Sequence, residues 1–206
     1  MIKLENVKVC GLARAIYSAR NAYNSWDKSD SDLEADVIGD ADMELALKLA
    51  KGGSVHAKYR RMIVVYVDIT APLYWWKEAD TYKVGTVANS CSTMHKIHAK
   101  EFEITDFSFE QLTAEAERHL QNTIDLLNEY RLDFISTKEK RSWWQMIQLL
   151  PSSYNQKRTL MLNYEVLNNI YFSRKGHRLT EWEDFRKWIE TLPYSELITV
   201  EEKERK

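Results

Sequence analysis

Hydrophobic positions along the chain predict short strands and longer helices. Residues 2–9 alternate loosely between apolar and polar side chains, which is typical of a half-buried strand. Residues 60–70, RRMIVVYVDIT, are dense in β-branched side chains and predict a buried strand. Apolar residues recur every three or four positions over residues 109–135, which indicates a long amphipathic helix.

The same spacing predicts several further helices. They cover residues 12–24, 43–51, 73–80, 139–149, 156–173 and 180–190. Gly52 and Gly53 follow the second of these as a stop signal, and Pro72 precedes the third, where its missing N–H costs nothing. Thr180 and Glu183 have the spacing of a capping box for the last one.

Polar segments connect the predicted elements. Residues 25–36 are rich in Ser and Asp and predict an exposed loop, after which Asp40 or Asp42 can cap the next helix. Residues 81–101 show no clear period, so we expect a loop with some helix.

Length and composition suit one compact domain. The 206 residues are 44% hydrophobic and 29% charged, which allows a sizeable buried core. Because no linker or repeat divides the chain, we expect one helix-rich α+β domain over residues 1–206, with a small antiparallel or mixed sheet. Residues 192–206 are expected to form a flexible charged tail.

Charge and cysteine content argue against several classes of protein. A net charge of -2 provides no general basic field for nucleic acids or anionic membranes. No apolar run approaches the roughly 20 residues that span a bilayer, and the first residues lack a secretory signal. The two cysteines, Cys10 and Cys91, are too few for a disulfide framework. We therefore expect a cytoplasmic protein that binds neither membranes nor nucleic acids in general.

Two aromatic clusters are candidate ligand surfaces. The first comprises Tyr74, Trp75, Trp76 and Tyr82, whose rings could stack on a base or a flavin. The second is the pair at positions 143–144. For both clusters the alternative is packing in the core or at a subunit contact, and the sequence leaves both interpretations open.

The histidines and basic residues define no site by themselves. His95 and His98 could share a helix face and hold a metal, but the sequence places no third ligand, so we predict no metal site. Residues 58–61 contain three cations, which form either an anion-binding patch or a solvated entrance to the strand. The sequence contains neither a phosphate-binding glycine loop nor a hydrolase or zinc-protease motif, and we assign no catalytic residue.

Four segments resemble conserved segments of one enzyme family when they are taken in order. Residues 18–26 read SARNAYNSW, residues 71–95 APLYWWKEADTYKVGTVANSCSTMH, residues 149–154 LLPSSY, and residues 163–174 NYEVLNNIYFSR. They are similar to the flavin-dependent thymidylate synthases, the ThyX family. That family has an Ala-Pro step, a helix and R-H-R-x-x-S-x-N-E-x-S-x-R-Y, and later a Leu-Pro step and N-x-R-S-L-M-N-F-x-x-x-R.

This resemblance implies sites for FAD and for a nucleotide-like small molecule. It implies a cofactor-binding set made of His56, Tyr82, Lys83, Asn163 and Asn169. It implies a substrate-binding set made of Glu78, Thr86, Asn89, Ser92 and Arg174. Family members are homotetramers with sites between subunits, so it also implies a homotetramer that binds its ligand at a subunit interface.

Several phosphate-binding arginines of the family are replaced in this sequence. The replacements are Thr81, Met94, Ile147 and Glu165, while Lys83 and Arg174 remain as cations at matched positions. A phosphate prefers forked, permanently charged donors, and each lost contact costs about 1.5–3 kcal/mol. These departures argue against ordinary methylation of dUMP.

Three classes of function remain open on this basis. An enzyme could keep a flavin in a remodelled pocket, where the cofactor would carry out reduction or one-carbon transfer. A non-catalytic protein could reuse the fold to bind another ligand or a protein partner, and an assembly protein could use the architecture alone. The charge of the pocket separates them, because an enzyme acting on phosphates is not expected to replace arginine with Met, Ile and Glu.

Overall fold

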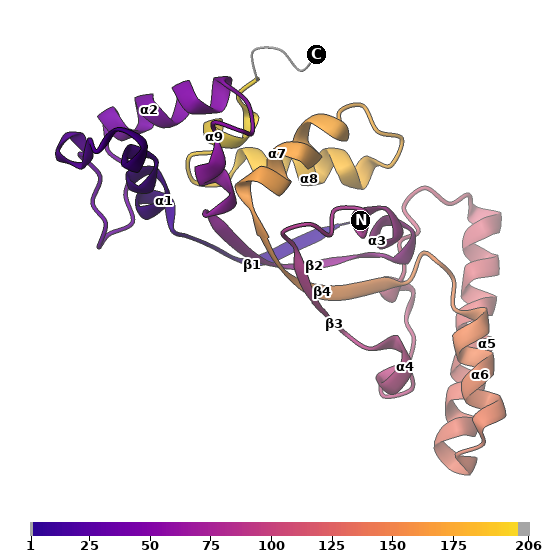
Figure 1. Ribbon diagram of the computed structural model, residues 1–206. Helices are drawn as coiled ribbons and strands as arrows, with labels where there is room; N and C mark the ends of the chain where they lie inside the picture. The colour runs from indigo at the N-terminus through magenta and orange to yellow at the C-terminus, as the bar shows by residue number, and fades with distance from the viewer. Residues whose placement is uncertain (1, 202–206) are drawn as a thin grey trace. The chain divides into compact units, whose positions relative to one another are not determined.

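The computed structural model describes residues 2–201, which include a four-stranded sheet (Figure 1). The strands are β1 (Lys3–Cys10), β2 (Val64–Pro72), β3 (Val87–Ser90) and β4 (Asn155–Asn163). Their order in the antiparallel sheet is β1-β2-β4-β3. The predicted helix-rich α+β fold with a small sheet is therefore confirmed.

The chain divides into two compact units, and each of the four strands contributes residues to both. Among the described residues, unit 1 comprises 2–3, 69–81 and 89–158, and unit 2 comprises 4–68, 82–88 and 159–201.

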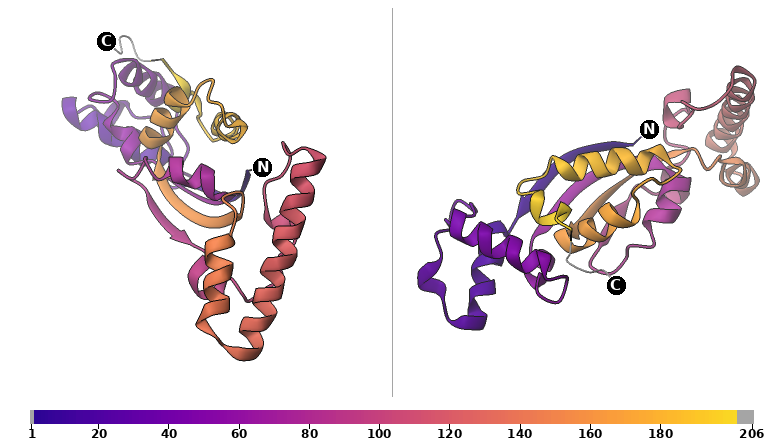
Figure 2. Two further views of the ribbon diagram at one scale, coloured as in Figure 1. Left: turned by 90° about the vertical axis from the view of Figure 1, so that its right-hand side faces the viewer. Right: turned by 90° about the horizontal axis from the view of Figure 1, so that it is seen from above.

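Unit 1 is built on a helical hairpin. Its elements are α3 (Leu73–Ala79), α4 (Thr93–Lys96), the 3₁₀ turn η4 (Ile104–Asp106), α5 (Ala114–Thr137) and α6 (Lys140–Leu149). Figure 2 shows α5 and α6 side by side and antiparallel, with a short turn between them. Their apolar faces bury Leu120, Ile124, Leu127 and Met146 together with Phe102 and Phe107.

Unit 2 packs short helices around a second core. Its elements are α1 (Leu12–Ala19), η1 (Arg20–Tyr23), η2 (Trp26–Lys28), α2 (Asp40–Lys51), η3 (Lys58–Arg61), α7 (Tyr164–Ser173), α8 (Thr180–Glu190) and α9 (Glu196–Thr199). The fully buried side chains include Ile16, Ile63, Tyr164, Trp182 and Phe185. Within residues 2–201, no helix is both long and apolar enough to cross a membrane.

The prediction of one helix over residues 156–173 is wrong. Residues 155–163 form β4, and α7 begins only at Tyr164. Gln156, Leu160 and Leu162 are buried while Thr159 is exposed, so the burial follows a period of two at the end of the segment. The side chain of Asn163 then caps α7 by accepting a hydrogen bond from the backbone N–H of Val166 at 3.0 Å.

The expected flexible tail over residues 192–206 is also wrong for the part that the structure describes. Residues 196–199 form α9, and Leu197 and Ile198 are fully buried. Their burial removes apolar surface from water, which anchors this segment in the core of unit 2. Residues 202–206 lie outside the described residues.

Helix caps differ from those that the sequence predicts. The first residue of α2 is Asp40, but the cap comes from Asp30, whose carboxylate accepts hydrogen bonds from the backbone N–H groups of Ala41 and Asp42. These bonds, with the one from Ala41 dominant, lower the pKa of Asp30. The capping box of α8 is absent, because its N-cap is Leu179 and no side chain caps it.

Candidate functional site

Arg174 is held by two aromatic rings in unit 2. It follows the last residue of α7, and its Nε donates a hydrogen bond of 2.9 Å to the hydroxyl of Tyr82. Its guanidinium carbon lies 4.6 Å from the ring centroid of Trp182 and 5.3 Å from that of Tyr82. Both distances are in the range of cation–π interactions, so this half-buried cation has a fixed position.

The loop that carries Tyr82 packs against the start of α7. Gly85 has a φ of +80°, and a Cβ atom there would lie 2.9 Å from Nδ2 of Asn163, so only glycine allows this approach. The Oγ1 atom of Thr86 is buried, and no hydrogen-bond partner for it occurs among residues 2–201. A hydroxyl in this state is available to bind a ligand.

His56 lines a separate cavity of unit 2. The volume of about 610 Å³ is in the usual range for small-molecule sites. Part of the lining comes from residues 18–23, which belong to the segment that resembles the ThyX family. Tyr23, Val55 and Met62 expose 90%, 71% and 51% of their surface, so the lining is largely apolar and aromatic.

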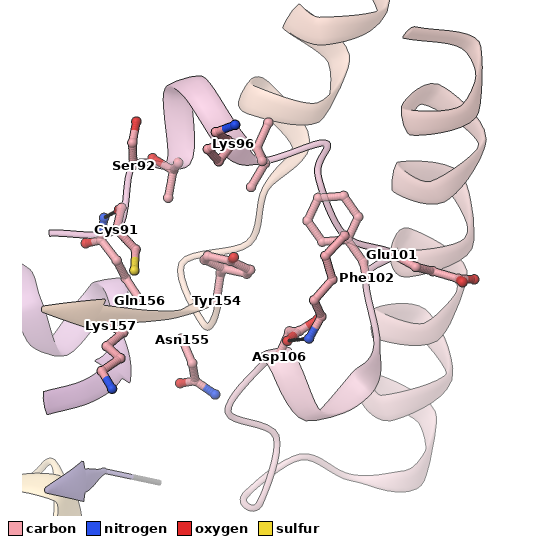
Figure 3. Close-up of a pocket in the computed structure, with 13 residues that line it drawn as sticks. Cys91, Ser92, Lys96, Glu101, Phe102, Asp106, Tyr154, Asn155, Gln156 and Lys157 are labelled. Atoms are coloured by element: carbon pink, nitrogen blue, oxygen red, sulfur yellow. Dashed lines mark hydrogen bonds and ion pairs between the residues drawn. The ribbon is translucent and has the colours of Figure 1, made fainter. Parts of the chain in front are cut away.

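Ser92 lines a polar cavity of about 210 Å³ in unit 1. Figure 3 shows Cys91 and Gln156 on one side of the Tyr154 ring and Phe102 with Asp106 on the other. The backbone of Cys91 is fixed to β4, because its N–H donates to the Lys157 carbonyl at 2.9 Å and its carbonyl accepts from Nε2 of Gln156 at 2.7 Å.

Two titratable groups of this cavity stay protonated near neutral pH. Lys100 donates a hydrogen bond of 2.8 Å to Asp106, and this bond raises the pKa of Lys100. Burial raises the pKa of Tyr154. The cavity thus offers an ammonium group, paired with Asp106, and a phenol as hydrogen-bond donors.

The structure brings together only part of the predicted binding set. The 82–88 loop contacts both ends of α7: Tyr82 contacts Arg174 at the C-terminal end, and Gly85, next to Thr86, approaches Asn163 at the N-terminal end. Lys83 is exposed on the same loop and Asn169 is exposed on α7, while His56 belongs to the separate cavity. Glu78, Asn89 and Ser92 belong to unit 1.

Glu165, which replaces a family arginine, is an ion-pair partner inside unit 2. Its Oε2 lies 3.8 Å from Nη1 of Arg60, and Arg60 is fully buried with its Nε donating to the Leu197 carbonyl at 2.7 Å. Arg60 therefore belongs neither to an exposed anion patch nor to a solvated strand entrance. Sequence patterns could not show this, because the partners of Arg60 are more than 100 residues away.

Most of the first aromatic cluster belongs to the core. Trp75 and Trp76 are almost fully buried, and the indole N–H of Trp76 donates to the Gln156 carbonyl at 2.9 Å. The guanidinium carbon of Arg158 covers the Trp76 ring at 4.3 Å and its Nη1 pairs with Asp80 at 2.9 Å. The core interpretation is correct for these two tryptophans, and Arg158 is a contact that the sequence did not reveal.

No metal centre is found in the described part of the chain. No group of three or more His, Cys, Asp or Glu side chains there is arranged to hold an ion.

Solved structures match this arrangement over nearly the whole chain. The flavin-dependent thymidylate synthase ThyX from Helicobacter pylori, complexed with FAD and dUMP, has a TM-score of 0.68 and 18% identity, covering 94% of this chain and 96% of that chain. The chain has the ThyX fold. A second structure of that enzyme with FAD and dUMP has a TM-score of 0.70 and 17% identity, covering 96% of both chains.

The ThyX fold also occurs in another similar structure. PolB, a UMP/dUMP methylase from Streptomyces cacaoi bound with 5-Br UMP, has a TM-score of 0.62 and 14% identity, covering 93% of this chain and 87% of that chain. No protein-family model and no curated protein matches the sequence. The resemblance drawn from the degenerate motifs is thus confirmed at the level of the fold.

Proposed function

We propose that this chain is a divergent ThyX-like protein that binds FAD and a nucleotide-type ligand, and that it methylates dUMP poorly. The single observation that carries the proposal is the position of Arg174. This cation matches the family motif and is held by Tyr82 and Trp182. Tyr82 belongs to the 82–88 loop, which also carries the buried hydroxyl group of Thr86. A fixed guanidinium group next to aromatic rings suits an anionic ligand with a planar base.

The residues around His56 fit a flavin cofactor. The cavity of about 610 Å³ combines exposed apolar and aromatic surface for a ring system with the polar groups of His56 and Lys58. These residues would hold part of FAD, and Thr86 offers a buried hydroxyl elsewhere in unit 2. When bound, the flavin would supply hydride or one-carbon transfer, while the protein residues would orient the ligand and exclude water.

The replaced arginines support weak binding of dUMP. Ile147 packs against the core of unit 1. Glu165 stands where the family has a phosphate-binding arginine, and its carboxylate pairs with Arg60. Their positions supply no positive charge, and a carboxylate near a phosphate would repel it. Ligands bound by the similar structures are pyrimidine nucleotides, so we propose a related nucleotide with less dependence on its phosphate.

A non-catalytic binding protein is the second candidate. It is supported by the same neutral or acidic replacements, because they remove groups that a phosphate substrate needs and leave the scaffold intact. In this case Arg174 would bind an anionic ligand without turnover.

We also propose a cytoplasmic homotetramer that binds its ligand at a subunit interface. The exposed apolar side chains of Tyr23, Val55 and Met62 support a subunit contact, since such patches are uncommon on monomers. The cysteines Cys10 and Cys91 are free thiols, which suits a reducing compartment. Light scattering on the purified protein would test the tetramer, and a monomer would contradict it.

A flavin titration tests the proposed function. FAD is added to the purified protein and binding is followed by the visible absorbance and fluorescence of the flavin. We expect binding to weaken in His56→Ala and to be unchanged in His119→Ala, an exposed histidine of α5. Absence of FAD binding would favour the non-catalytic candidate, and equal binding by both variants would place the flavin away from His56.

A further inference from the structure

A second ligand-sized cavity lies at the turn of the helical hairpin of unit 1. Its volume is about 350 Å³. Two histidines, two lysines and two aromatic rings contribute to its lining: His95, His98, Lys138, Lys140, Phe134 and Trp143. No acidic side chain in the described part of the chain lines it, so its charge is of one sign.

His98 presents an unused polar atom. Its Nδ1 is buried, and no hydrogen-bond partner for this atom occurs within residues 2–201. The residue is fixed in place by two contacts. Its ring packs edge-on against that of Phe134, with the ring centroids 4.8 Å apart, and its backbone carbonyl accepts a hydrogen bond of 3.1 Å from Nε of Arg131. Leaving a buried polar atom unpaired is unfavourable, and a ligand that bonds to Nδ1 would remove that cost.

The aromatic wall of the cavity is held in position by a backbone contact. The indole N–H of Trp143 donates a hydrogen bond of 3.1 Å to the backbone carbonyl of Met94. The Trp143 ring lies edge-on against the Trp144 ring, with the ring centroids 4.9 Å apart. A ring fixed in this way can stack on a planar ligand at little entropic cost.

The two lysines come from either side of the hairpin turn. Lys138 is the C-cap of α5 in the left-handed region, with φ 59°, and its Nζ lies 5.7 Å from the Phe134 ring centroid. Lys140 begins α6, three residues before Trp143 and hence on the same helix face. The nearby acid Asp133 accepts a hydrogen bond from Ser142 instead.

We propose that this cavity binds a phosphomonoester carried on a planar ring. The phosphate binds the two lysines, the ring stacks on Trp143, and Nδ1 of His98 makes a hydrogen bond to the ligand. Two ammonium groups match the double charge of a phosphomonoester better than the single charge of a carboxylate. Met94, at a position where the ThyX family has a phosphate-binding arginine, also lines this cavity. The proposal itself is carried by Lys138, Lys140, His98 and Trp143, which belong to neither the FAD set nor the nucleotide set.

The probe for this site is phenyl phosphate, titrated calorimetrically into the full chain. We expect a dissociation constant of about 1 mM or below, which is typical of a small ligand held by a few contacts. Benzoate and inorganic phosphate should both bind more weakly, since each lacks one part of the match. If benzoate or inorganic phosphate bound as tightly as phenyl phosphate, the result would contradict a site for a phosphomonoester on a planar ring.

Variants locate the site. Lys138→Asn, which tolerates the left-handed backbone, combined with Lys140→Ala should weaken phenyl phosphate binding about tenfold or more. The matched control Lys187→Ala, an exposed lysine of α8, should leave it unchanged. Equal affinity in both proteins would overturn the proposal, as would the absence of any binding.

A spectroscopic readout separates the site from general charge attraction. In ¹⁵N-histidine spectra the resonances of His98 should shift on adding phenyl phosphate, and His98→Phe should weaken binding while circular dichroism shows an intact fold. A shift confined to the other histidines would contradict the site.

Discussion

Glu165 lies 3.8 Å from the buried guanidinium group of Arg60. The acidic residue at a position where the ThyX family has arginine therefore has a role inside the protein. Restoring the family residue would place two cations together in a buried environment, where like charges repel strongly.

Glu165→Arg should for this reason destabilise the protein and fail to restore dUMP binding. We expect the free energy of unfolding to fall by about 3–5 kcal/mol, as for other broken buried ion pairs. Urea denaturation measures this, with the exposed Glu44→Arg as control, which should change stability by less than about 0.5 kcal/mol. Equal stability of both variants would show that the pair is not structural.

Arg174→Lys tests the aromatic support of the matched cation. Lysine keeps the charge but loses the flat stacking on Trp182 and the directed hydrogen bond to Tyr82. We expect a loss of about 1–2 kcal/mol in unfolding free energy. Arg178→Lys, four residues further at an exposed position, is the control and should have no measurable effect. A similar loss in both would argue against a fixed Arg174.

Gly85→Ala tests the close approach between the 82–88 loop and Asn163. Both the positive φ and the clash with Nδ2 disfavour alanine, so we expect a destabilisation of about 2–3 kcal/mol in thermal or urea unfolding. Gly176 also has a positive φ, +69°, but no atom lies within 4 Å of its added Cβ. Gly176→Ala should therefore cost only about 1 kcal/mol. Equal costs would mean that the approach to Asn163 is loose.

The protein should lose stability in alkali through its buried tyrosines. Burial raises the pKa of Tyr59 to about 12, and its hydroxyl donates to the Ala46 carbonyl at 2.9 Å. Because the folded pKa lies above the unfolded one, this stability is complete below about pH 10 and is lost as pH rises towards 12. Tyr59→Phe should be less stable at pH 8 by about 1 kcal/mol and should show a shallower alkaline loss. An unchanged slope between pH 10 and 12 would contradict this.

The sequence correctly predicted the elements that can be recognised from the local pattern of their apolar side chains. The β-branched run of β2 and the repeated apolar positions of α5 were sufficient for a strand and a long helix. In residues 155–163 the cations Lys157 and Arg158 interrupt the alternation, and Arg158 is accommodated by Trp76 and Asp80 from elsewhere in the chain. That long-range contact is invisible in a local pattern, so β4 was predicted as helix.

The binding residues also divide into those that the sequence could identify and those that only the fold reveals. The resemblance to the family assigned Tyr82 to the cofactor-binding set and Arg174 to the substrate-binding set, and the structure places the two side chains in contact. Neither the unpartnered Nδ1 of His98 nor the pairing of Arg60 with Glu165 follows from spacing, since each depends on which segments the fold brings together.

The measurement that tests the central claim most directly is a calorimetric titration of dUMP into the FAD-supplemented protein. The replaced arginines predict a dissociation constant well above about 1 µM, the affinity that corresponds to about -8 kcal/mol. Arg174→Ala should weaken any residual nucleotide binding further, and Arg178→Ala should not. Binding of dUMP at micromolar affinity or tighter would contradict the account, because it would show that the phosphate site survives without those guanidinium groups.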